Sequence, residues 1–583
     1  MSGHTRSTAT AAFAPAAPGE TVTLSGAQII VGLLERWGIR TVSGIPGGAI
    51  LPLYDALSHS TRIRHVLARH EQGATFMAQG MARLSGQAAV CLASSGPGAT
   101  NLITGIADAK LDSIPIVCIT GQVPTPMIGT DAFQEVDICT LARPLTKYCV
   151  QARSAAELLD ILPRALEIAV SGRPGPVLVD VPKDIQMQTA RFAAWPQPAP
   201  VAAAAAADAD VPHAESLRRA AALINAASRP VLYLGGGIIH AGASALALEL
   251  AERASLPVTT TLLGLGALPS DHPLNLGMLG MHGARYTNLA LQESDLLIAV
   301  GARFDDRATG AVAKFCPGAR IIHIDMDARE LNKIKTADVA IRADAAAALA
   351  ALLPQITTRP RIAWLSRVAD LKREHPLRMP GADDPLAHYG LIRAVAAALD
   401  GEEIVTTDVG QHQMWAAQAY PLNRPRQWLT SGGLGTMGFG LPAAIGAALA
   451  EPERTVVCFS GDGSILMNIQ ELATAVEEDL NIKIVLMDNG ALGLVHQQQD
   501  LFYGRRQFAS TFRKRTDFVR VAQGFGMHAL SLADEADAGA ARSALMRALQ
   551  RPGPVLIHAP IDAAQKVFPM VPPGAANSEM IDG

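Results

Sequence analysis

The sequence predicts an α/β protein with three doubly wound domains, each built on a parallel sheet. Short, continuous aliphatic runs alternate with longer stretches of helical spacing along most of the 583-residue chain. Such runs are typical of parallel strands buried on both faces. The chain is 49% hydrophobic but only 4% aromatic, with 51 glycines, a composition that lets helices lie close to sheets. At ~150 residues per domain, three domains account for the length.

The expected strands fall into three groups that are separated by helical stretches. They occupy residues 88–94, 115–120 and 176–182; then 230–236, 295–302 and 320–327; and finally 403–410, 455–463, 482–489 and 554–559. Right-handed crossovers between parallel strands place the ligand-binding loops at the carboxyl ends of the strands.

Two changes in composition mark the domain boundaries. Residues 193–212 are rich in Pro and Ala and predict a linker, whereas residues 355–388 are charged and contain Pro, which predicts a connector with one short helix. The predicted organisation is a disordered tail (1–21), a first domain (22–192), the linker (193–212), a second domain (213–354), the connector (355–388) and a third domain (389–583).

Charge and cysteine content exclude several classes of protein. A net charge of −4 offers no basic surface for nucleic acid. The six cysteines form no CxxC pair, and Cys91, Cys118 and Cys458 lie in apolar runs, so buried, reduced thiols of a cytoplasmic protein are expected rather than disulfides or a metal cluster. The first 20 residues lack the pattern of a signal peptide, and no apolar run is long enough to span a membrane.

A glycine-rich turn after one expected strand predicts an anion and metal site. In Gly461-Asp462-Gly463, the glycines allow the backbone to approach an anion closely, and the following helix presents unpaired N–H groups to it. Asp462 supplies a carboxylate oxygen and Asn489, at the end of the next strand, an amide oxygen, both suited to magnesium beside a diphosphate. The alternative is an ordinary structural turn, which the tripeptide alone favours.

The first group of strands contains a similar turn. Ser94–Asn101 (SSGPGATN) follows a strand and precedes a helix, as Ser460–Asn468 does in the third group. Two similar domains with such turns suggest a cofactor held between them, although small-residue turns recur in all α/β proteins.

The Gly-Asp-Gly turn with its distant asparagine resembles the signature of thiamine-diphosphate enzymes. The resemblance implies that Asp462, Asn489 and the carbonyl of Ala491 bind magnesium, and that Gly463 and Ser464 touch the diphosphate.

A thiamine enzyme also needs a carboxylic group beside the aminopyrimidine of its cofactor. Glu71, in RHEQGATFMAQGMAR, opens an expected helix in the first domain. A glutamate in that position is often only a complement to the helix dipole. The family places its catalytic glutamate in this His-Glu context, which favours catalysis.

Longer strings narrow the resemblance to the catalytic large subunits of acetolactate synthases, from about residue 22 onwards. They include GIPGGAILPLYDAL, GPGATNLITGIADA, DAFQEVDI, GRPGPVLVDVPKDIQ, GARFDDRATG, DVGQHQMWAAQ and GLGTMGFGLPAAIGA. The resemblance implies decarboxylation of pyruvate and transfer of the hydroxyethyl group to a second 2-keto acid, in the biosynthesis of valine, leucine and isoleucine. It makes the first domain pyrimidine-binding, the second FAD-binding and the third diphosphate- and Mg²⁺-binding.

The resemblance also assigns residues to the site. Near the catalytic centre it places Gly48, Phe133, Gln134 and Lys183, with Arg307 as the anchor of the second substrate's carboxylate. For the diphosphate and pyrimidine it implies Val409, Gly410, Gln411, His412, Gly435 and Met437. For FAD it implies Arg173, Gly235, Gly236, Gly237, Thr261, Leu262, Met281, Gly301, Arg303, Asp325 and Asp344. From the residues alone, core packing of Phe133 and Met437 remains the preferred interpretation. For Arg307 the alternative is a surface ion pair with Asp305 or Asp306.

One departure from the family bears on substrate choice. Gln498, in LGLVHQQQD, stands where most acetolactate synthases carry a tryptophan that packs against larger second substrates. A weak preference for 2-ketobutyrate over pyruvate is therefore expected, as in the bacterial type I isozyme, which carries the same triple Gln. The tail KVFPMVPPGAAN also resembles that isozyme.

Other functions remain open at this point. A pyruvate oxidase would use the same cofactors, and a catalytically silent cofactor-binding subunit would keep the fold. A glyoxylate carboligase is disfavoured by Glu71, because that relative carries an apolar residue there. The family further implies a homodimer or homotetramer and a small regulatory subunit.

Overall fold

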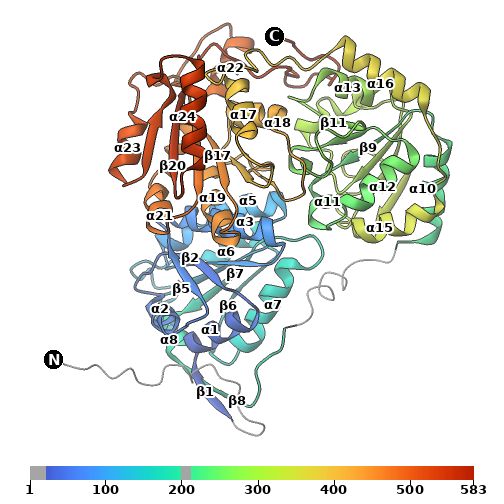
Figure 1. Cartoon of the computed structure of the whole chain (residues 1–583). Helices are drawn as coiled ribbons and strands as arrows, with labels where there is room; N and C mark the ends of the chain where they lie inside the picture. The colour runs from blue at the N-terminus through green and yellow to red at the C-terminus, as the bar shows by residue number, and fades with distance from the viewer. Residues whose placement is uncertain (1–20, 199–211) are drawn as a thin grey trace. The chain divides into compact units, whose positions relative to one another are not determined.

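The computed structural model describes residues 21–198 and 212–583, which belong to two compact units, Met1–Ala207 and Asp208–Gly583 (Figure 1). Almost all of the predicted tail and most of the predicted linker lie outside the described residues. Within the described ranges, no helix combines the length and the apolar character needed to cross a membrane.

The first unit is built on a six-stranded parallel sheet of order β3-β2-β4-β5-β7-β6. Its strands are β2 (Thr41–Gly44), β3 (Arg64–Leu67), β4 (Ala89–Ala93), β5 (Ile116–Gln122), β6 (Tyr148–Gln151) and β7 (Val177–Pro182), and β1 (Val22–Ser25) pairs with β8 (Thr189–Phe192). Its helices are α1 (Gly26–Arg36), α2 (Leu51–Ser58), α3 (Glu71–Ser85), α4 (Pro97–Thr100), α5 (Ile103–Asp112), α6 (Ile138–Ala142), α7 (Leu158–Val170) and α8 (Lys183–Met187). Apolar side chains of α1 and α7 cover one face of the sheet, while α3 packs against β4 and β5.

The second sheet, of order β11-β10-β9-β12-β13-β14, is also parallel. Its strands are β9 (Pro230–Leu234), β10 (Val258–Thr260), β11 (Asn275–Met278), β12 (Leu296–Val300), β13 (Arg320–Asp325) and β14 (Val339–Arg342). Its helices are α10 (Ala214–Ala226), α11 (Gly236–His240), α12 (Ser244–Ala254), α13 (Arg285–Glu293), α14 (Asp306–Thr309), α15 (Ala345–Leu352) and α16 (Ile362–Glu374).

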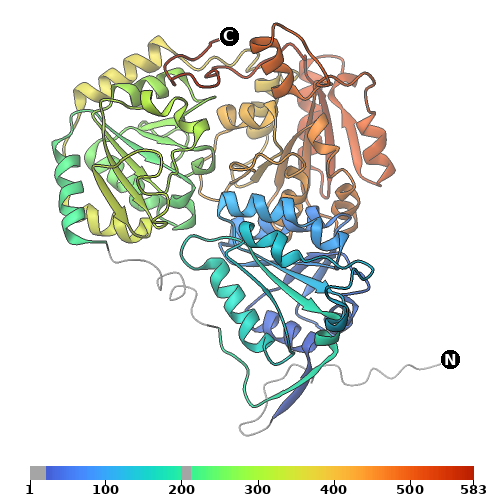
Figure 2. The ribbon, with the colours of Figure 1, turned by 180° about the vertical axis from the view of Figure 1, so that it is seen from behind.

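Alternate residues of this sheet enter two separate cores. Leu232 and Ile298 pack against α10, α12 and α15, whereas Val231 and Leu297 pack against α13 and α16. Helices therefore cover both faces (Figure 2), as continuous apolar strands require. Helix α16 lies in the predicted connector, and its Trp364 completes the second of these cores.

The third sheet has the order β16-β15-β17-β18-β20-β19 and is again parallel. Its strands are β15 (Ile404–Thr407), β16 (Trp428–Leu429), β17 (Val456–Gly461), β18 (Ile482–Asp488), β19 (His528–Ser531) and β20 (Val555–Pro560). Its helices are α17 (His388–Ala397), α18 (Gln411–Ala419), α19 (Gly440–Ala450), α20 (Asp462–Ile465), α21 (Glu471–Glu477), α22 (Gly493–Phe502), α23 (Phe518–Gly524) and α24 (Ala538–Gln550).

The first and third sheets share one topology. If strands are numbered along the chain within each sheet, both have the order 2-1-3-4-6-5, whereas the second sheet has the order 3-2-1-4-5-6. The similarity suggested by the two glycine-rich turns is thus confirmed at the level of topology. The order of the second sheet is that of dinucleotide-binding domains.

The predicted fold class is confirmed, and every expected strand is present. Cys91, Cys118 and Cys458 are buried, free thiols within β4, β5 and β17, as expected.

Arg361 attaches the predicted connector to two helices of the second sheet, and its replacement tests how much this attachment stabilises the fold. Arg361 is 5% exposed, and its guanidinium donates to the carbonyls of Ile224, Ala227 and Ala254, at the ends of α10 and α12. We expect Arg361→Met to lower the free energy of unfolding of this unit by about 3 kcal/mol, because buried carbonyls lose their donors. Urea denaturation measures this, with the exposed Arg359→Met as the control; equal losses in both variants would contradict it.

Candidate active site

The turns after β15, β17 and β18 surround one cavity at the carboxyl edge of the third sheet. All residues predicted to contact the diphosphate, the pyrimidine or the metal from this domain line it, namely Val409, Gly410, Gln411, His412, Gly435, Met437, Asp462, Gly463, Ser464, Asn489 and Ala491. Gly461 of the predicted turn also lines it. Residues that sequence reasoning missed complete the wall, namely Trp415, Met487, Leu492, Gly493, Leu494 and Val495. The structure therefore brings this predicted set together, and their individual roles stay predictions.

Glycines line the cavity where a side chain would collide with the opposite wall. A Cβ at Gly461 would lie 2.8 Å from His412 Nδ1, and one at Gly493 would lie 2.2 Å from Gln411 Oε1. Backbone is thereby exposed at the turn, as close approach to an anion requires.

His412 offers the cavity a neutral imidazole. Burial lowers the pKa of His412 to about 3, so its ring carries no charge near neutral pH. Its Nε2 is buried, and no hydrogen-bond partner for it lies among the described residues. A buried ring nitrogen without a protein partner is a group that a bound ligand can satisfy.

The carboxylates at the predicted metal position repel each other. Burial, and then the neighbouring carboxylate of Asp488, raise the pKa of Asp462. Asp488 is paired with Arg515 at 2.5 Å and His558 at 3.1 Å, whereas no ion pair of Asp462 is found among the described residues. A divalent cation would neutralise Asp462. The described residues contain no cluster of three or more His, Cys, Asp or Glu able to hold a metal; the predicted ligand set instead combines Asp462 with the amide of Asn489 and the carbonyl of Ala491.

Asp408, which sequence reasoning did not select, ties the walls of the cavity together. It is fully buried, and its carboxylate accepts the N–H groups of Val409 at 2.9 Å and Gly438 at 2.7 Å and the hydroxyl of Ser460 at 3.3 Å. Burial raises the pKa of Asp408 to about 6. Its place at the end of a buried strand was the only signal in the sequence.

In the first unit, Glu71 lies against the turn that resembles the diphosphate turn. It is the first residue of α3, and its Oε2 accepts a hydrogen bond from Asn101 Nδ2 at 2.9 Å. A Cβ at Gly98 would lie 3.3 Å from Oε1, and one at Gly96 would lie 2.9 Å from Gln134. Gln134 has a φ of +61°, a costly conformation outside glycine. One turn, 94–101, therefore contacts both predicted catalytic residues.

The other predicted catalytic residues of this unit lie at the same sheet edge. Lys183 begins α8 after β7, and Gln186 of that helix donates to the carbonyl of Ala49, beside Gly48, at 2.8 Å. Phe133 is 86% exposed, which rules out the core-packing interpretation in this unit.

The predicted flavin residues of the second unit follow successive strands of the second sheet at their carboxyl ends. Gly235, Gly236 and Gly237 follow β9, Thr261 and Leu262 follow β10, Met281 follows β11, Gly301 and Arg303 follow β12, Asp325 ends β13 and Asp344 follows β14. The turn after β9 touches the turn after β12, since a Cβ at Gly235 would lie 2.0 Å from the Gly301 carbonyl oxygen. The order of the strands reverses between these two turns, where open α/β sheets bind ligands.

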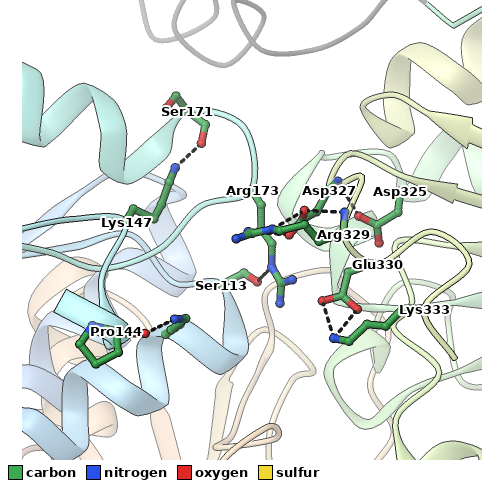
Figure 3. A network of polar contacts seen from close by, with 11 residues as sticks. Ser113, Pro144, Lys147, Ser171, Arg173, Asp325, Asp327, Arg329, Glu330 and Lys333 are labelled. Atoms are coloured by element: carbon green, nitrogen blue, oxygen red, sulfur yellow. Dashed lines mark hydrogen bonds and ion pairs between the residues drawn. The ribbon is translucent and has the colours of Figure 1, made fainter. Parts of the chain in front are cut away.

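Two arginines predicted to belong to the site, Arg173 and Arg307, contact residues of their own units. Arg173, in the first unit, donates through Nε to Ser113 Oγ at 2.8 Å (Figure 3). Arg307 lies beside Met281, whose N–H donates to its carbonyl at 2.8 Å. The Arg307 side chain is 68% exposed and lies 3.7 Å from Asp306, which is the surface pair considered as the alternative.

Two of the three consecutive glutamines in α22, Gln497 and Gln498, differ in exposure. Gln498 is exposed, whereas Gln497 is buried and contacts Gln411 of the cavity. Sequence reasoning considered only Gln498 and missed Gln497.

Comparison with known proteins agrees with this geometry. Three family models of thiamine pyrophosphate enzymes match the chain. The N-terminal TPP binding domain matches residues 24–141, the central domain 217–352 and the C-terminal TPP binding domain 408–559. The chain is 62% identical to the acetolactate synthase isozyme 1 large subunit of Escherichia coli (strain K12), covering 96% of this chain and 97% of that protein. It is 48% identical to the isozyme 2 large subunit of the same organism, covering 96% and 100%. It is 46% identical to the acetolactate synthase large subunit of Parasynechococcus marenigrum, covering 96% and 91%. The chain therefore belongs to the acetolactate synthase large-subunit family of thiamine pyrophosphate enzymes.

Proposed function

We propose that this chain is the catalytic subunit of an acetolactate synthase. It decarboxylates pyruvate and joins the remaining two-carbon unit to a second 2-keto acid, giving 2-acetolactate or 2-aceto-2-hydroxybutyrate for branched-chain amino acid synthesis. The observation that carries this proposal is the 62% identity to the isozyme 1 large subunit over 97% of its length.

The cavity of the third sheet suits the diphosphate and Mg²⁺ end of the cofactor. When bound, thiamine diphosphate supplies the electron sink for decarboxylation. The glycine turn brings backbone close to an anion, and Asp462 is a buried carboxylate whose pKa is raised by burial and by Asp488. Neutral His412 adds a ring nitrogen that can donate to, or accept from, the ligand without adding charge.

Glu71 is the residue that holds and moves a proton at the pyrimidine. Asn101 occupies its Oε2, which leaves Oε1, beside Gly98, as the oxygen that exchanges the proton. Gln134 and Lys183, at the same edge of the first sheet, are proposed to surround the substrate, and Arg307 to bind the carboxylate of the second 2-keto acid.

The second sheet is proposed to bind FAD. Its 3-2-1-4-5-6 strand order and the close contact of the turns at Gly235 and Gly301 support this assignment. The net reaction is not a redox reaction, so the flavin is not required to take electrons.

We further propose that the chain works in the cytoplasm as a homodimer or homotetramer with a small regulatory subunit. The relatives' names support the last point, since they are called large subunits.

Glu71→Gln tests the catalytic assignment. We expect a ~10²–10⁴-fold loss of acetolactate formation, because an amide cannot exchange the proton that a carboxyl exchanges. Colorimetric detection of acetoin from pyruvate, with and without thiamine diphosphate and Mg²⁺, measures this. The exposed Glu157→Gln serves as the control, and undiminished activity of Glu71→Gln would refute the assignment.

Asp462→Asn tests the metal assignment. Removing the carboxylate should raise the Mg²⁺ concentration for half-maximal activity at least ~10-fold. Titration of chelator-treated enzyme with Mg²⁺ measures this shift, and Asp479→Asn, an exposed residue of the same domain, should leave it unchanged. Equal Mg²⁺ requirements in both variants would remove Asp462 from the site.

Gln498→Trp tests substrate choice. An indole adds apolar contact for the larger acceptor, so the preference for 2-ketobutyrate over pyruvate should rise ~10- to 200-fold. Competition between both acceptors measures the product ratio. A wild-type enzyme that already prefers 2-ketobutyrate strongly would contradict the argument from Gln498.

A further inference from the structure

Three buried amide side chains form a series that ends at the predicted metal ligand Asn489. Asn489 is 8% exposed, Gln411 is 4% exposed and Gln497 is 1% exposed. Asn489 Nδ2 donates to Gln411 Oε1 at 2.9 Å, and Gln411 Nε2 donates to Gln497 Oε1 at 3.0 Å. Each amide has one donor end and one acceptor end, so the orientation of each constrains the next.

The C-terminal tail determines the orientation of the first amide. The N–H of Val567 donates to Gln497 Oε1 at 2.8 Å, and the carbonyl of Val567 accepts from Gln497 Nε2 at 3.0 Å. Backbone N–H and C=O groups cannot exchange roles. Gln497 therefore has a single orientation that satisfies both.

Two acceptors determine the orientation of the second amide, Gln411. Gln411 Nε2 faces two acceptors, Gln497 Oε1 and the carbonyl of Gln565, each at 3.0 Å. A flipped Gln411 would set its oxygen against both of them in a buried environment, which is costly. Its Oε1 must therefore face Asn489.

The third amide, Asn489, is then left with its oxygen on the side away from Gln411. The Asn489 NH₂ group is held by Gln411, while Asn489 Oδ1 accepts the N–H of Ala491 at 3.1 Å. A carbonyl oxygen has two lone pairs, so one remains for a cation. The opposite orientation would present an NH₂ group to the cation, which binds oxygen ligands only.

We infer that the backbone of Val567, acting through Gln497 and Gln411, orients Asn489 so that its oxygen, and not its nitrogen, meets Mg²⁺. Gln497 is on this basis a positioning residue, and the segment of the tail at 565–567 (Figure 1) is part of the metal site although it contributes no ligand. The inference rests on the proposed role of Asn489 as a magnesium ligand.

The test measures Mg²⁺-dependent binding of thiamine diphosphate, without turnover. Trp415 lines the cavity and is 1% exposed, so its fluorescence reports binding as Mg²⁺ is added. Gln497→Leu should raise the Mg²⁺ concentration for half-maximal binding at least ~10-fold, while the flavin is retained. Its unfolding temperature falls because the buried groups of Val567 lose their partners, so binding is measured below the unfolding transition. Gln523→Leu, on the exposed side of α23 in the same domain, is the control and should have no effect.

Gln497→Glu separates amide orientation from simple packing. As a carboxylate it offers acceptors only, so the carbonyl of Val567 loses its donor and Mg²⁺ binding should weaken at pH 8. When protonated, it presents one O–H donor and one acceptor, as Gln497 does, and the affinity should recover as the pH falls, since burial raises the pKa of such a carboxyl. The ratio between the Mg²⁺ affinities of the wild type and Gln497→Leu should not change with pH.

Two results would overturn the inference. One is wild-type Mg²⁺ affinity in both Gln497 variants; the other is a Gln497→Glu variant that stays as weak as Gln497→Leu at every pH. Asn489→Ala distinguishes the causes. If it weakens Mg²⁺ binding while the Gln497 variants do not, the series fails and the proposed metal site stands. If Asn489→Ala also binds Mg²⁺ normally, both are wrong.

Discussion

Parallel sheets with right-handed crossovers open a crevice wherever the order of their strands reverses, and residues of each predicted site lie at such a point. The reversal falls between β2 and β4, between β9 and β12, and between β15 and β17. The chains that follow these two strands leave for opposite faces of the sheet, so a crevice opens between them. Turns beside the crevice can still touch where both residues are glycine, as at Gly235, where a Cβ would lie 2.0 Å from the Gly301 carbonyl oxygen.

Polar groups can be buried at these edges only if they are hydrogen-bonded, and the structure uses them to join turns. Asp408 binds three segments of the third sheet's cavity. Asp180, in β7, accepts from Thr120, Gln122 and Gln151 of the neighbouring strands, and burial raises its pKa to about 6. Asp408 thus joins turns at the cavity, whereas Asp180 joins three adjacent strands.

Features with a local signature were predictable from the sequence, whereas features that depend on distant pairing were not. Long aliphatic runs revealed the buried strands, but β10 and β16, with three and two residues, are too short to show a period. The turn at Gly461 and the position of Asn489 follow from spacing along adjacent strands. The contact between Gln497 and Val567 joins residues 70 positions apart, and no local pattern marks either of them.

The C-terminal tail also links the loops of the second sheet to the cavity of the third sheet. Beyond Val567, the carbonyl of Phe568 accepts from Gln418, which also donates to the carbonyl of His282. The N–H of Val571 donates to the carbonyl of Met281, a predicted flavin contact, at 2.9 Å. The tail is therefore held at one end by the second sheet's loops and at the other by the amides of the cavity.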